Sequence, residues 1–576
     1  MNSFHAELAR VCAELETPLF GVTGDSNLFF VDSFIQRGGH YVAATHEGAA
    51  VLMAAGYASV SGRVGLATIT QGAVTNTVTA LADATRSHLP LVLFAGETPS
   101  WDDDNVQRVP TDAIVRSSGA EYLRLEHLAD TDDILSLAFR RACRSAQPVV
   151  VGIPTDYAHE PCSLSTSLST SLSTSLSTSL STSTSPSPSG SPSPFPSEIA
   201  RPGPSGAEVL PARDAVRSAA DVLLRARRPL ILAGRGAIAE DDRAATLALA
   251  RRLGARVATT LRAKELFRGD PADLGIFGGL STGRSAAYFD AADVIVAIGA
   301  SLNSYTTSQG AATHGKRVVH IDADAAKARS TPFIHGSAAP TARALLAELA
   351  ADGIDSDQPL WDVVSPADSE NSIESGPARS APSSDRRPGT VEYIESLDLL
   401  DSLLPKDRLL TVDGGRIFFE SVRRVSVASP RDYVHTMSMG SIGLGLSLAM
   451  GASFADPARL SVLVSGDGGF MLGGLSEFTT AVRHRLKLLV VVLNDGCYGA
   501  EHNHFVKRGH DPATTYFDWP DLAPVARSLG GRGVEIRRLA DFQHLTDAIA
   551  SETWPLLVDV KLDPNRIPMD FHRTRP

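Results

Sequence analysis

Short segments that are apolar at almost every position recur along the whole chain. Examples are "LPLVLFAGE" (89–97), "ADVIVAIGA" (292–300) and "LKLLVVVLND" (486–495). Strands that are buried on both faces of a parallel sheet have this composition. Because these segments alternate with helical stretches through short connections, the sequence predicts an α/β protein with three doubly wound parallel sheets in series.

Two polar segments divide the chain. Residues 162–206 repeat Ser, Leu and Thr and then turn to Ser and Pro, a composition that buries too little apolar surface to fold, so we predict a disordered linker. The leucines recur at every fourth residue and also fit a helical stripe, which the surrounding Ser and Thr disfavour. A second linker is predicted at 353–389. The predicted domains are residues 1–161, 207–352 and 390–576.

The composition of the chain argues against some binding partners and cellular locations. The formal net charge of −12 argues against nucleic acid, which needs clustered Lys and Arg. No apolar run reaches the roughly 18 residues of a membrane span, and the first 20 residues lack a signal-peptide core. The four cysteines form no C-x-x-C pair, which indicates a reducing compartment. We therefore expect a cytoplasmic location.

The stretch "LVSGDGGFMLGG" (463–474) ends an apolar strand on an acidic residue, Asp467. The next such strand ends on Asn494 and Asp495, and the carboxyl ends of parallel strands meet at one edge of the sheet. Oxygen ligands of this kind suit Mg²⁺, which takes further ligands from phosphate oxygens. A backbone carbonyl near Cys497 offers one more oxygen. The adjacent glycines would let backbone amides approach a diphosphate at a helix start: Gly466, Gly468 and Gly469.

This pattern resembles the thiamine diphosphate site of the superfamily that contains acetolactate synthase, benzoylformate decarboxylase and pyruvate decarboxylase. The family signature is G-D-G, a helix and a strand, then N-N, and Asp495 stands here in place of the second Asn. The resemblance implies that Asp467, Asp495 and the Cys497 carbonyl hold Mg²⁺, with Asn494 as the fallback. It also implies pyrimidine and diphosphate domains that flank a central Rossmann-like domain.

A second matching segment is "ATHEGAAVLMAAGYA" (44–58), which resembles the family's R-H-E-x-x-A segment. The resemblance places Glu47 at the catalytic glutamate. In the family this carboxyl group bonds to the aminopyrimidine ring and stabilises the imino tautomer, whose nitrogen removes the thiazolium proton. Taken alone, a Glu in the first turn of a helix also has a purely structural explanation, since it interacts favourably with the helix dipole.

Other segments match the cofactor contacts of the family. In "SMGSIGLGLSLAMGA" (438–452), Gly440 and Ile442 fall where the aminopyrimidine is held, with Ile442 as the apolar wedge between the two rings. An ordinary core residue is the alternative for Ile442. In "DGGRIFFE" (413–420), Gly415 and Arg416 are the candidates nearest the diphosphate.

The segments expected to face the substrate resemble the family less specifically. "TQGAVTN" (70–76) and "VQRVPTDAIV" (106–115) match active-site segments, so Gln71 and Gln107 are substrate candidates, although a loop glutamine explains Gln107 equally well. His502 is a candidate proton donor, against the alternative of a mobile polar loop. "TQGAVTN" lacks the proline of acetolactate synthases. "GASLNSYTT" (299–307) replaces the acidic run of flavin-dependent members, which argues against FAD.

The resemblance implies an acetolactate synthase-like carboligase. Such an enzyme decarboxylates a 2-oxo acid, passes through an enamine and joins it to a second carbonyl acceptor. The alternatives are a decarboxylase that releases an aldehyde and a catalytically silent scaffold. The family assembles its site between subunits, with Glu47 from one and the diphosphate from the other, so the resemblance implies a homodimer or homotetramer.

Overall fold

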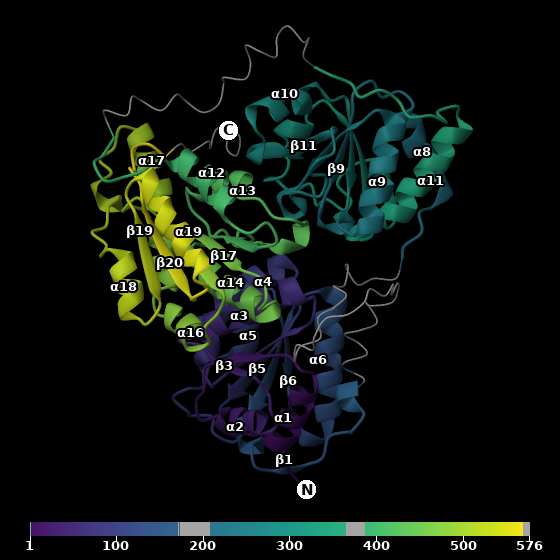
Figure 1. Ribbon diagram of the computed structural model, residues 1–576. Coiled ribbons are helices and arrows are strands. Elements are labelled where there is room, and N and C mark those ends of the chain that lie inside the picture. Colours follow the sequence, from purple (N-terminus) through teal and green to yellow (C-terminus); the bar gives the residue numbers. More distant parts are fainter. Residues whose placement is uncertain (1, 171, 173–207, 364–385, 568–576) are drawn as a thin grey trace, which may run out of the picture. The chain divides into compact units, whose positions relative to one another are not determined.

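Three six-stranded parallel sheets follow one another along the chain in a computed structural model (Figure 1). The structure describes residues 2–170, 172, 208–363 and 386–567. It divides into two compact units. Among the described residues, the first unit joins the N-terminal domain with residues 387–421 and 434–565, and the second joins the central domain with residues 422–433. The α/β fold class and the three serial sheets predicted from the sequence are confirmed.

The N-terminal sheet has the strand order β3-β2-β4-β5-β7-β6. Its strands are β2 (Leu19–Gly21), β3 (Tyr41–Ala43), β4 (Gly65–Ile69), β5 (Leu91–Glu97), β6 (Glu121–Arg124) and β7 (Pro148–Pro154). Its helices are α1 (Phe4–Glu14), α2 (Leu28–Gln36), α3 (Glu47–Ser61), α4 (Val78–Ser87), α5 (Thr111–Ser117) and α6 (Thr131–Ser145). The predicted apolar segment 89–97 contains β5.

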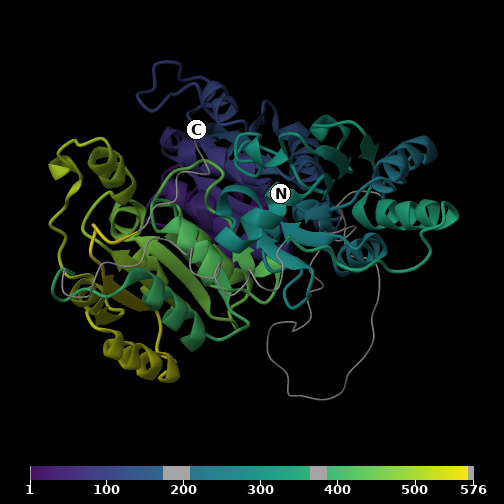
Figure 2. The same ribbon diagram turned by 90° about the horizontal axis from the view of Figure 1, so that it is seen from above.

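The C-terminal sheet has the order β16-β15-β17-β18-β20-β19, which repeats the N-terminal order strand for strand. Its strands are β15 (Leu409–Val412), β16 (Tyr433–Val434), β17 (Ser461–Gly466), β18 (Leu488–Asn494), β19 (Arg532–Ile536) and β20 (Leu556–Lys561). The helices are α12 (Tyr393–Leu403), α13 (Phe418–Arg424), α14 (Gly445–Ala455), α15 (Asp467–Gly473), α16 (Phe478–Arg483), α17 (Gly499–Lys507), α18 (Leu522–Ser528) and α19 (Phe542–Ala550). In Figure 2 the green and yellow strands run between helices on either side.

The N- and C-terminal domains meet through α3 and α14, which lie side by side (Figure 1). A Cβ on Gly56 of α3 would lie 2.1 Å from the backbone oxygen of Leu448, and one on Gly451 of α14 would lie 2.1 Å from the backbone oxygen of Met53. Each helix therefore presents a glycine to a backbone carbonyl of the other. Both helices are buried along nearly their whole length, so this contact lies in the core.

The central sheet has the order β11-β10-β9-β12-β13-β14, the order of a Rossmann fold. Its strands are β9 (Pro229–Ala233), β10 (Arg256–Thr259), β11 (Asp273–Ile276), β12 (Val294–Ile298), β13 (Arg317–Asp322) and β14 (Phe333–His335). Its helices are α8 (Arg213–Leu223), α9 (Glu240–Leu253), α10 (Gly283–Ala291) and α11 (Ala338–Ala351). Residues 422–433 belong to this unit, where the Lys264 ammonium donates to the Val425 carbonyl at 2.7 Å.

The "GRG" turn after β9 packs directly on the turn after β12. A Cβ on Gly234 would lie 2.2 Å from the Gly299 oxygen, and one on Gly299 would lie 2.5 Å from the carbonyl carbon of Gly236. The glycines therefore serve the contact between two backbone turns.

The first residues of the predicted linker pack on the N-terminal domain. The short strand β8 (Pro161–Cys162) pairs antiparallel with β1 (Asn2–Ser3). The following leucines, Leu164, Leu168 and Leu172, are at most 5% exposed and join the core beneath α1 and α6. Four-residue spacing places these leucines on the core, so the packed domain extends beyond residue 161. The rest of that linker, 173–206, lies outside the described residues, as does most of the second linker, 364–385.

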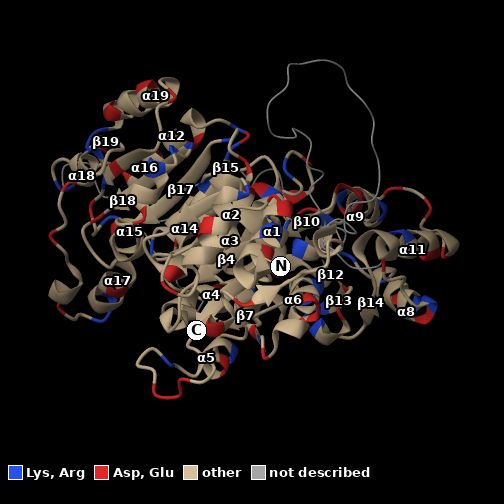
Figure 3. Ribbon diagram, turned by 90° about the horizontal axis from the view of Figure 1, so that it is seen from below, with Lys and Arg blue, Asp and Glu red and all other residues tan. Residues whose placement is uncertain are grey.

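The charged residues on the helices are of mixed sign, and the cysteines form no disulfides. Figure 3 shows basic and acidic residues side by side along the helices of the central domain. Among the described helices, none is long and apolar enough to cross a membrane. All four cysteines are free thiols.

Candidate functional site

Asp467 stands where β17 ends and α15 begins. Its side chain is 2% exposed, and its Oδ2 atom has no hydrogen-bond partner among the described residues. Burial, and then the nearby Asp495 carboxylate, raise the pKa of Asp467 well above its usual range. A buried carboxylate oxygen without a hydrogen-bond donor is costly unless a ligand compensates its charge. The position is therefore suited to a bound cation.

Asp495 follows β18 and is 4% exposed. Its Oδ1 accepts the backbone N–H of Cys497 at 3.0 Å, and its Oδ2 accepts a hydrogen bond from the Arg416 guanidinium at 2.5 Å. The preceding residue, Asn494, donates its side-chain amide to Asp559 on β20 at 2.9 Å. The amide of Asn494 is thus committed to a neighbouring strand, whereas Asp495 is the group that interacts with Asp467.

Arg416 lies in the turn after β15 and is 3% exposed. The preceding Gly415 has φ of +101°, a left-handed conformation that favours glycine. Besides Asp495, the guanidinium donates to Asn503 Oδ1 at 2.9 Å and to the Pro564 carbonyl at 2.8 Å. The sequence placed Arg416 at the diphosphate, and the structure directs its guanidinium to Asp495.

Asp413 holds the loop around Gly440 through hydrogen bonds. The sequence analysis did not predict this role. Asp413 is 1% exposed and accepts the backbone N–H groups of Gly414 and Gly443, both at 2.9 Å, and the Ser465 hydroxyl at 3.2 Å. Burial raises the pKa of Asp413 even though these donors lower it. One carboxylate thus joins β15, β17 and the loop that contains Ile442. The sequence signal was present, because Asp413 ends an apolar strand just before two glycines.

Ile442 and Gly440 occupy that loop. A Cβ on Gly414 would lie 3.3 Å from Ile442 Cγ2, so the Ile442 side chain lies over the turn after β15. Gly440 has φ of +78° and open space where a Cβ would stand. The half-buried Ile442 and the exposed Gly440 therefore border the same strand ends as Asp467.

The glycines after Asp467 allow close packing. A Cβ on Gly468 would lie 2.6 Å from the Tyr498 ring, and one on Gly469 would lie 2.6 Å from Asp413 Oδ2. At Gly466 the nearest atom would be 3.6 Å away, an ordinary contact. Gly468 and Gly469 are thus required by their neighbours, whereas a side chain at Gly466 would meet no clash.

The N-terminal sheet carries the other predicted residues on its own strand-end loops. Glu47 is the first residue of α3, and its Oε2 accepts the Asn76 amide at 2.9 Å. His46 caps this helix, since its Nδ1 accepts the Gly48 N–H at 3.0 Å. The loops after β4 and β5 meet where Gln71 Nε2 donates to Gln107 Oε1 at 3.0 Å. The carboxyl ends of parallel strands lie at one edge, so these groups share it.

Glu477 links the C-terminal domain to the start of α3. It is 1% exposed and accepts both the Thr45 N–H, at 3.0 Å, and the Thr45 hydroxyl, at 2.6 Å. Thr45 lies two residues before Glu47. A buried acid at the N-cap of α16 therefore fixes the backbone that presents Glu47, and no spacing in the sequence indicated this long-range pair.

His502 lies inside the C-terminal domain rather than on an open loop. It is 1% exposed, its Nε2 is 3.2 Å from Asn565 Oδ1, and its ring packs edge-on against Tyr516 at 5.2 Å. Helix α17 carries it. In this position His502 supports the packing of α17 on the chain that follows β20.

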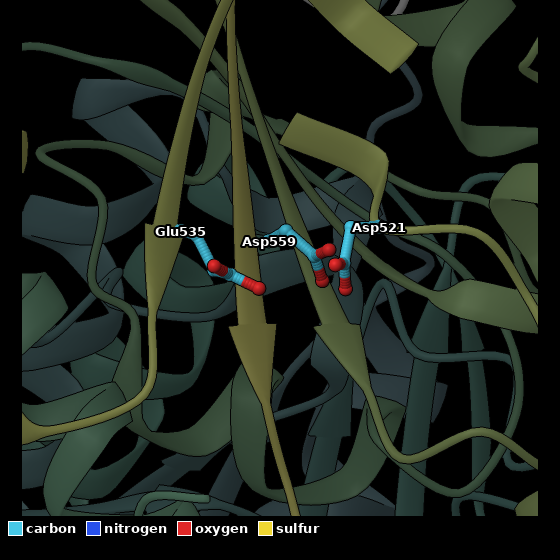
Figure 4. A group of neighbouring side chains, drawn as sticks. All are labelled: Asp521, Glu535 and Asp559. Carbon is cyan, nitrogen blue, oxygen red and sulfur yellow. The ribbon is translucent and has the colours of Figure 1, made fainter. Parts of the chain in front are cut away.

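One further acidic group lies near the site (Figure 4). The ligand atoms of Asp521, Glu535 and Asp559 are within 4.8 Å of one another. Lys561 Nζ lies 2.8 Å from Asp559 and 3.0 Å from Asp521, and Arg537 lies 2.7 Å from Glu535. The carboxylates already have cationic partners, so this group is an ion-pair network. Asp521, Arg537 and Lys561 of this network line a cavity of about 570 Å³ that also touches Asn494 and Asp495.

Three family profiles match the chain in the order of its three sheets. Residues 5–117 match the N-terminal thiamine pyrophosphate (TPP) binding domain of thiamine pyrophosphate enzymes, 216–349 match the central domain, and 413–560 match the C-terminal TPP binding domain. The chain therefore belongs to the thiamine pyrophosphate enzyme family. The family predicted from the sequence is confirmed.

Curated relatives are distant but cover nearly the whole chain. The acetolactate synthase large subunit of Haemophilus influenzae is 23% identical over 95% of this chain and 91% of its own length. The sulfoacetaldehyde acetyltransferase of Castellaniella defragrans is 26% identical over 94% and 89%. A Pseudomonas aeruginosa protein named "Probable 2-ketoarginine decarboxylase" is 25% identical over 89% and 85%. These relatives differ in reaction, so identity at this level sets the family rather than the substrate.

The residues present fit the cofactor that the family name implies. A diphosphate with a divalent cation needs hard oxygen ligands at a strand end with open backbone beside them. Asp467 supplies a buried oxygen that has no partner among the described residues, and Gly440 leaves open space beside the same strand ends.

Proposed function

We propose that the chain is a thiamine diphosphate- and Mg²⁺-dependent enzyme that decarboxylates a 2-oxo acid and joins the remaining acyl unit to a second carbonyl compound. The observation that carries the proposal is the buried Asp467 oxygen, which has no partner among the described residues and lies beside Asp495 at the ends of two adjacent strands. The acetolactate synthases and the acetyltransferase among the relatives support the joining step.

Asp467, Asp495 and the Cys497 carbonyl would hold the cation, and the cation would hold the diphosphate. The backbone at Gly466 and the turn at Gly415 would face the phosphate oxygens. The loop that Asp413 anchors would present Gly440 and Ile442 to the pyrimidine ring, since the hydrogen bond from Gly443 to Asp413 fixes its path.

When bound, thiamine diphosphate supplies a nucleophilic carbon and an electron sink for the decarboxylation. Glu47 would exchange a proton at its carboxyl oxygens with the pyrimidine ring. The Asn76 amide bonded to Oε2 orients that carboxyl group, and Glu477 fixes the backbone before it through Thr45. Gln71 and Gln107 would face the 2-oxo acid as a hydrogen-bonded pair.

The proposal includes a homodimer or homotetramer in which Glu47 of one subunit faces the diphosphate site of another, as the family resemblance implies. Sedimentation at micromolar concentration checks this. A protein that remains monomeric while fully active would contradict it.

Carbon dioxide release from a panel of 2-oxo acids, with thiamine diphosphate and Mg²⁺, tests the proposal. Glu47→Gln should lower kcat at least about a hundredfold, because general acid–base groups contribute on that scale. The control Glu126→Gln changes an exposed glutamate of the same domain and should leave kcat unchanged.

Product analysis separates the alternatives. An acyloin or acetolactate-type product supports the carboligase, whereas a free aldehyde favours the decarboxylase that the 2-ketoarginine relative suggests. If the protein binds the cofactor but turns over no 2-oxo acid, that result would contradict both the carboligase and the decarboxylase hypotheses. It would favour the catalytically silent scaffold.

A further inference from the structure

Arg416 and Asp495 form a buried ion pair at the proposed metal site. Their side chains are 1% and 3% exposed, and the guanidinium lies 2.5 Å from Asp495 Oδ2. A buried pair of this kind costs desolvation and is retained only where geometry and further hydrogen bonds compensate. The site therefore holds one cation beside two carboxylates before any metal binds.

The surroundings of Arg416 hold it in this geometry. Its Nη1 donates to Asn503 on α17 and to the Pro564 carbonyl, and its Nη2 also lies 3.5 Å from Cys497 Sγ. A Cβ on Gly499 would lie 2.3 Å from Arg416 Nε. Gly499 thus makes room for the guanidinium, and the arginine cannot turn away without losing three contacts.

The charges explain why such a residue is needed. The family signature, as the resemblance implies, has a neutral Asn where Asp495 stands. An Asp adds one negative charge next to Asp467, and burial with mutual repulsion makes two adjacent carboxylates costly. The guanidinium returns the charge of this position to that of an Asn, while both Asp495 oxygens stay in fixed places.

We infer that Arg416 is the built-in countercharge and positioning residue of Asp495, and that it lets an aspartate act as a metal ligand where the family pattern has a neutral side chain. The inference rests on the proposed function, because it needs the metal to bind at Asp467 and Asp495. It assigns Arg416 to the ligand rather than to the diphosphate, because Nη2 donates to Asp495 and Nη1 is occupied by Asn503 and Pro564.

A double-mutant cycle tests the inference on the full-length protein. The variants are Asp495→Asn, Arg416→Gln and the two together, which gives a neutral pair. Calorimetric titration measures the Mg²⁺ dependence of thiamine diphosphate binding, and a thermal melt without ligands measures the apo protein.

Asp495→Asn alone should weaken Mg²⁺ binding at least about tenfold, since loss of a metal-orienting contact has effects of ten- to a hundredfold. It leaves a buried, unpaired guanidinium next to the cation. Adding Arg416→Gln should recover most of that loss. The apo melting temperature should fall in each single variant and rise again in the double variant.

The rescue separates this role from a purely structural one. If Arg416 mattered only through Asn503 and Pro564, the second substitution would make Asp495→Asn worse, and that result would overturn the inference. The matched cycle at Arg116 and Asp112, an exposed pair of the N-terminal domain, should show no coupling in either measurement.

The experiment also separates the two proposals. Wild-type protein that shows no Mg²⁺-dependent binding of thiamine diphosphate would overturn the proposed function and the metal role of Asp495 with it. Wild-type protein that binds both, combined with a double variant no better than Asp495→Asn, would overturn the inference alone.

Discussion

The N- and C-terminal sheets have the same strand order, yet their strand-end loops carry different chemistry. In the C-terminal domain the loops hold buried charges, with Asp413, Asp467 and Asp495 at most 4% exposed. In the N-terminal domain Glu47 is half-buried and its neighbours at that edge are the amides Gln71, Asn76 and Gln107. One topology therefore carries two kinds of edge: a buried charged edge, to which the proposed function assigns a cation and diphosphate, and a more open amide edge, to which it assigns the organic substrate.

The largest expected effect comes from the contact that joins the two domains. Gly451→Val or Gly56→Val would drive a side chain into a backbone carbonyl 2.1 Å from the new Cβ, and should lower the free energy of unfolding by about 3 kcal/mol or more, at the upper end of overpacking costs. Urea denaturation measures the loss. The two losses should be similar because the contact is reciprocal.

Ala347→Val on the exposed face of α11 is the control for a β-branched residue in a helix and should cost only a few tenths of a kcal/mol, about 0.5 at most. A tolerated valine at either glycine would contradict the described contact between α3 and α14.

The next effect concerns a buried titratable group that belongs to the N-terminal domain but not to its strand-end loops. Burial in α1, and secondarily His159, lower the pKa of His5 from 6.5 to about 4. The unfolded chain therefore binds a proton more readily, so stability is full above pH 6.5 and is lost as the pH falls toward 4, by up to about 3 kcal/mol.

His5→Leu should remove most of this acid sensitivity, as measured by denaturant unfolding between pH 7 and pH 4. His127→Gln, at an exposed position, should leave the pH profile unchanged. An identical acid limb in wild type and His5→Leu would rule out His5 as its source.

The two substitutions with the smallest expected effects compare the buried edge of the C-terminal sheet with the open edge of the N-terminal sheet. Asp413→Asn keeps the shape of the side chain but turns an amide NH₂ toward groups that donate to both oxygens, so it should cost about 2 kcal/mol. Asn76→Ala at the open edge should cost less than about 1 kcal/mol and act mainly on kcat, through Glu47. Equal losses of stability would contradict the contrast between a buried and an open edge.

The sequence predicted the central strands of each sheet better than its edge strands. The confirmed strands, such as β12, β17 and β18, are buried on both faces and therefore apolar at most positions. The unpredicted strands include both borders of every sheet: β3 and β6, β11 and β14, β16 and β19. Border strands are short and half covered, as in "DLGI" of β11 and "RGVEI" of β19, so they lack the apolar run on which the prediction relied.

At the site, the sequence indicated which acids end the strands but not what holds them. Asp467 and Asp495 follow from the motif, whereas the Arg416 pair depends on the direction of a side chain after Gly415, whose left-handed turn no spacing specifies. Glu477 and Thr45 are 432 residues apart in the chain. Contacts of that separation are fixed by packing, which a single sequence does not reveal.

The reciprocal glycine contact also limits when the protein can complete its folding during synthesis. Gly451 leaves the ribosome 395 residues after Gly56, which at 5–20 residues per second is roughly 20–80 s. Throughout that interval α3, of which 13 of 15 residues are buried in the folded protein, has its own sheet to pack on but lacks α14. The N-terminal domain is thus completed only by the C-terminal domain, and the face of α3 that α14 covers stays exposed to other nascent chains until α14 has been made.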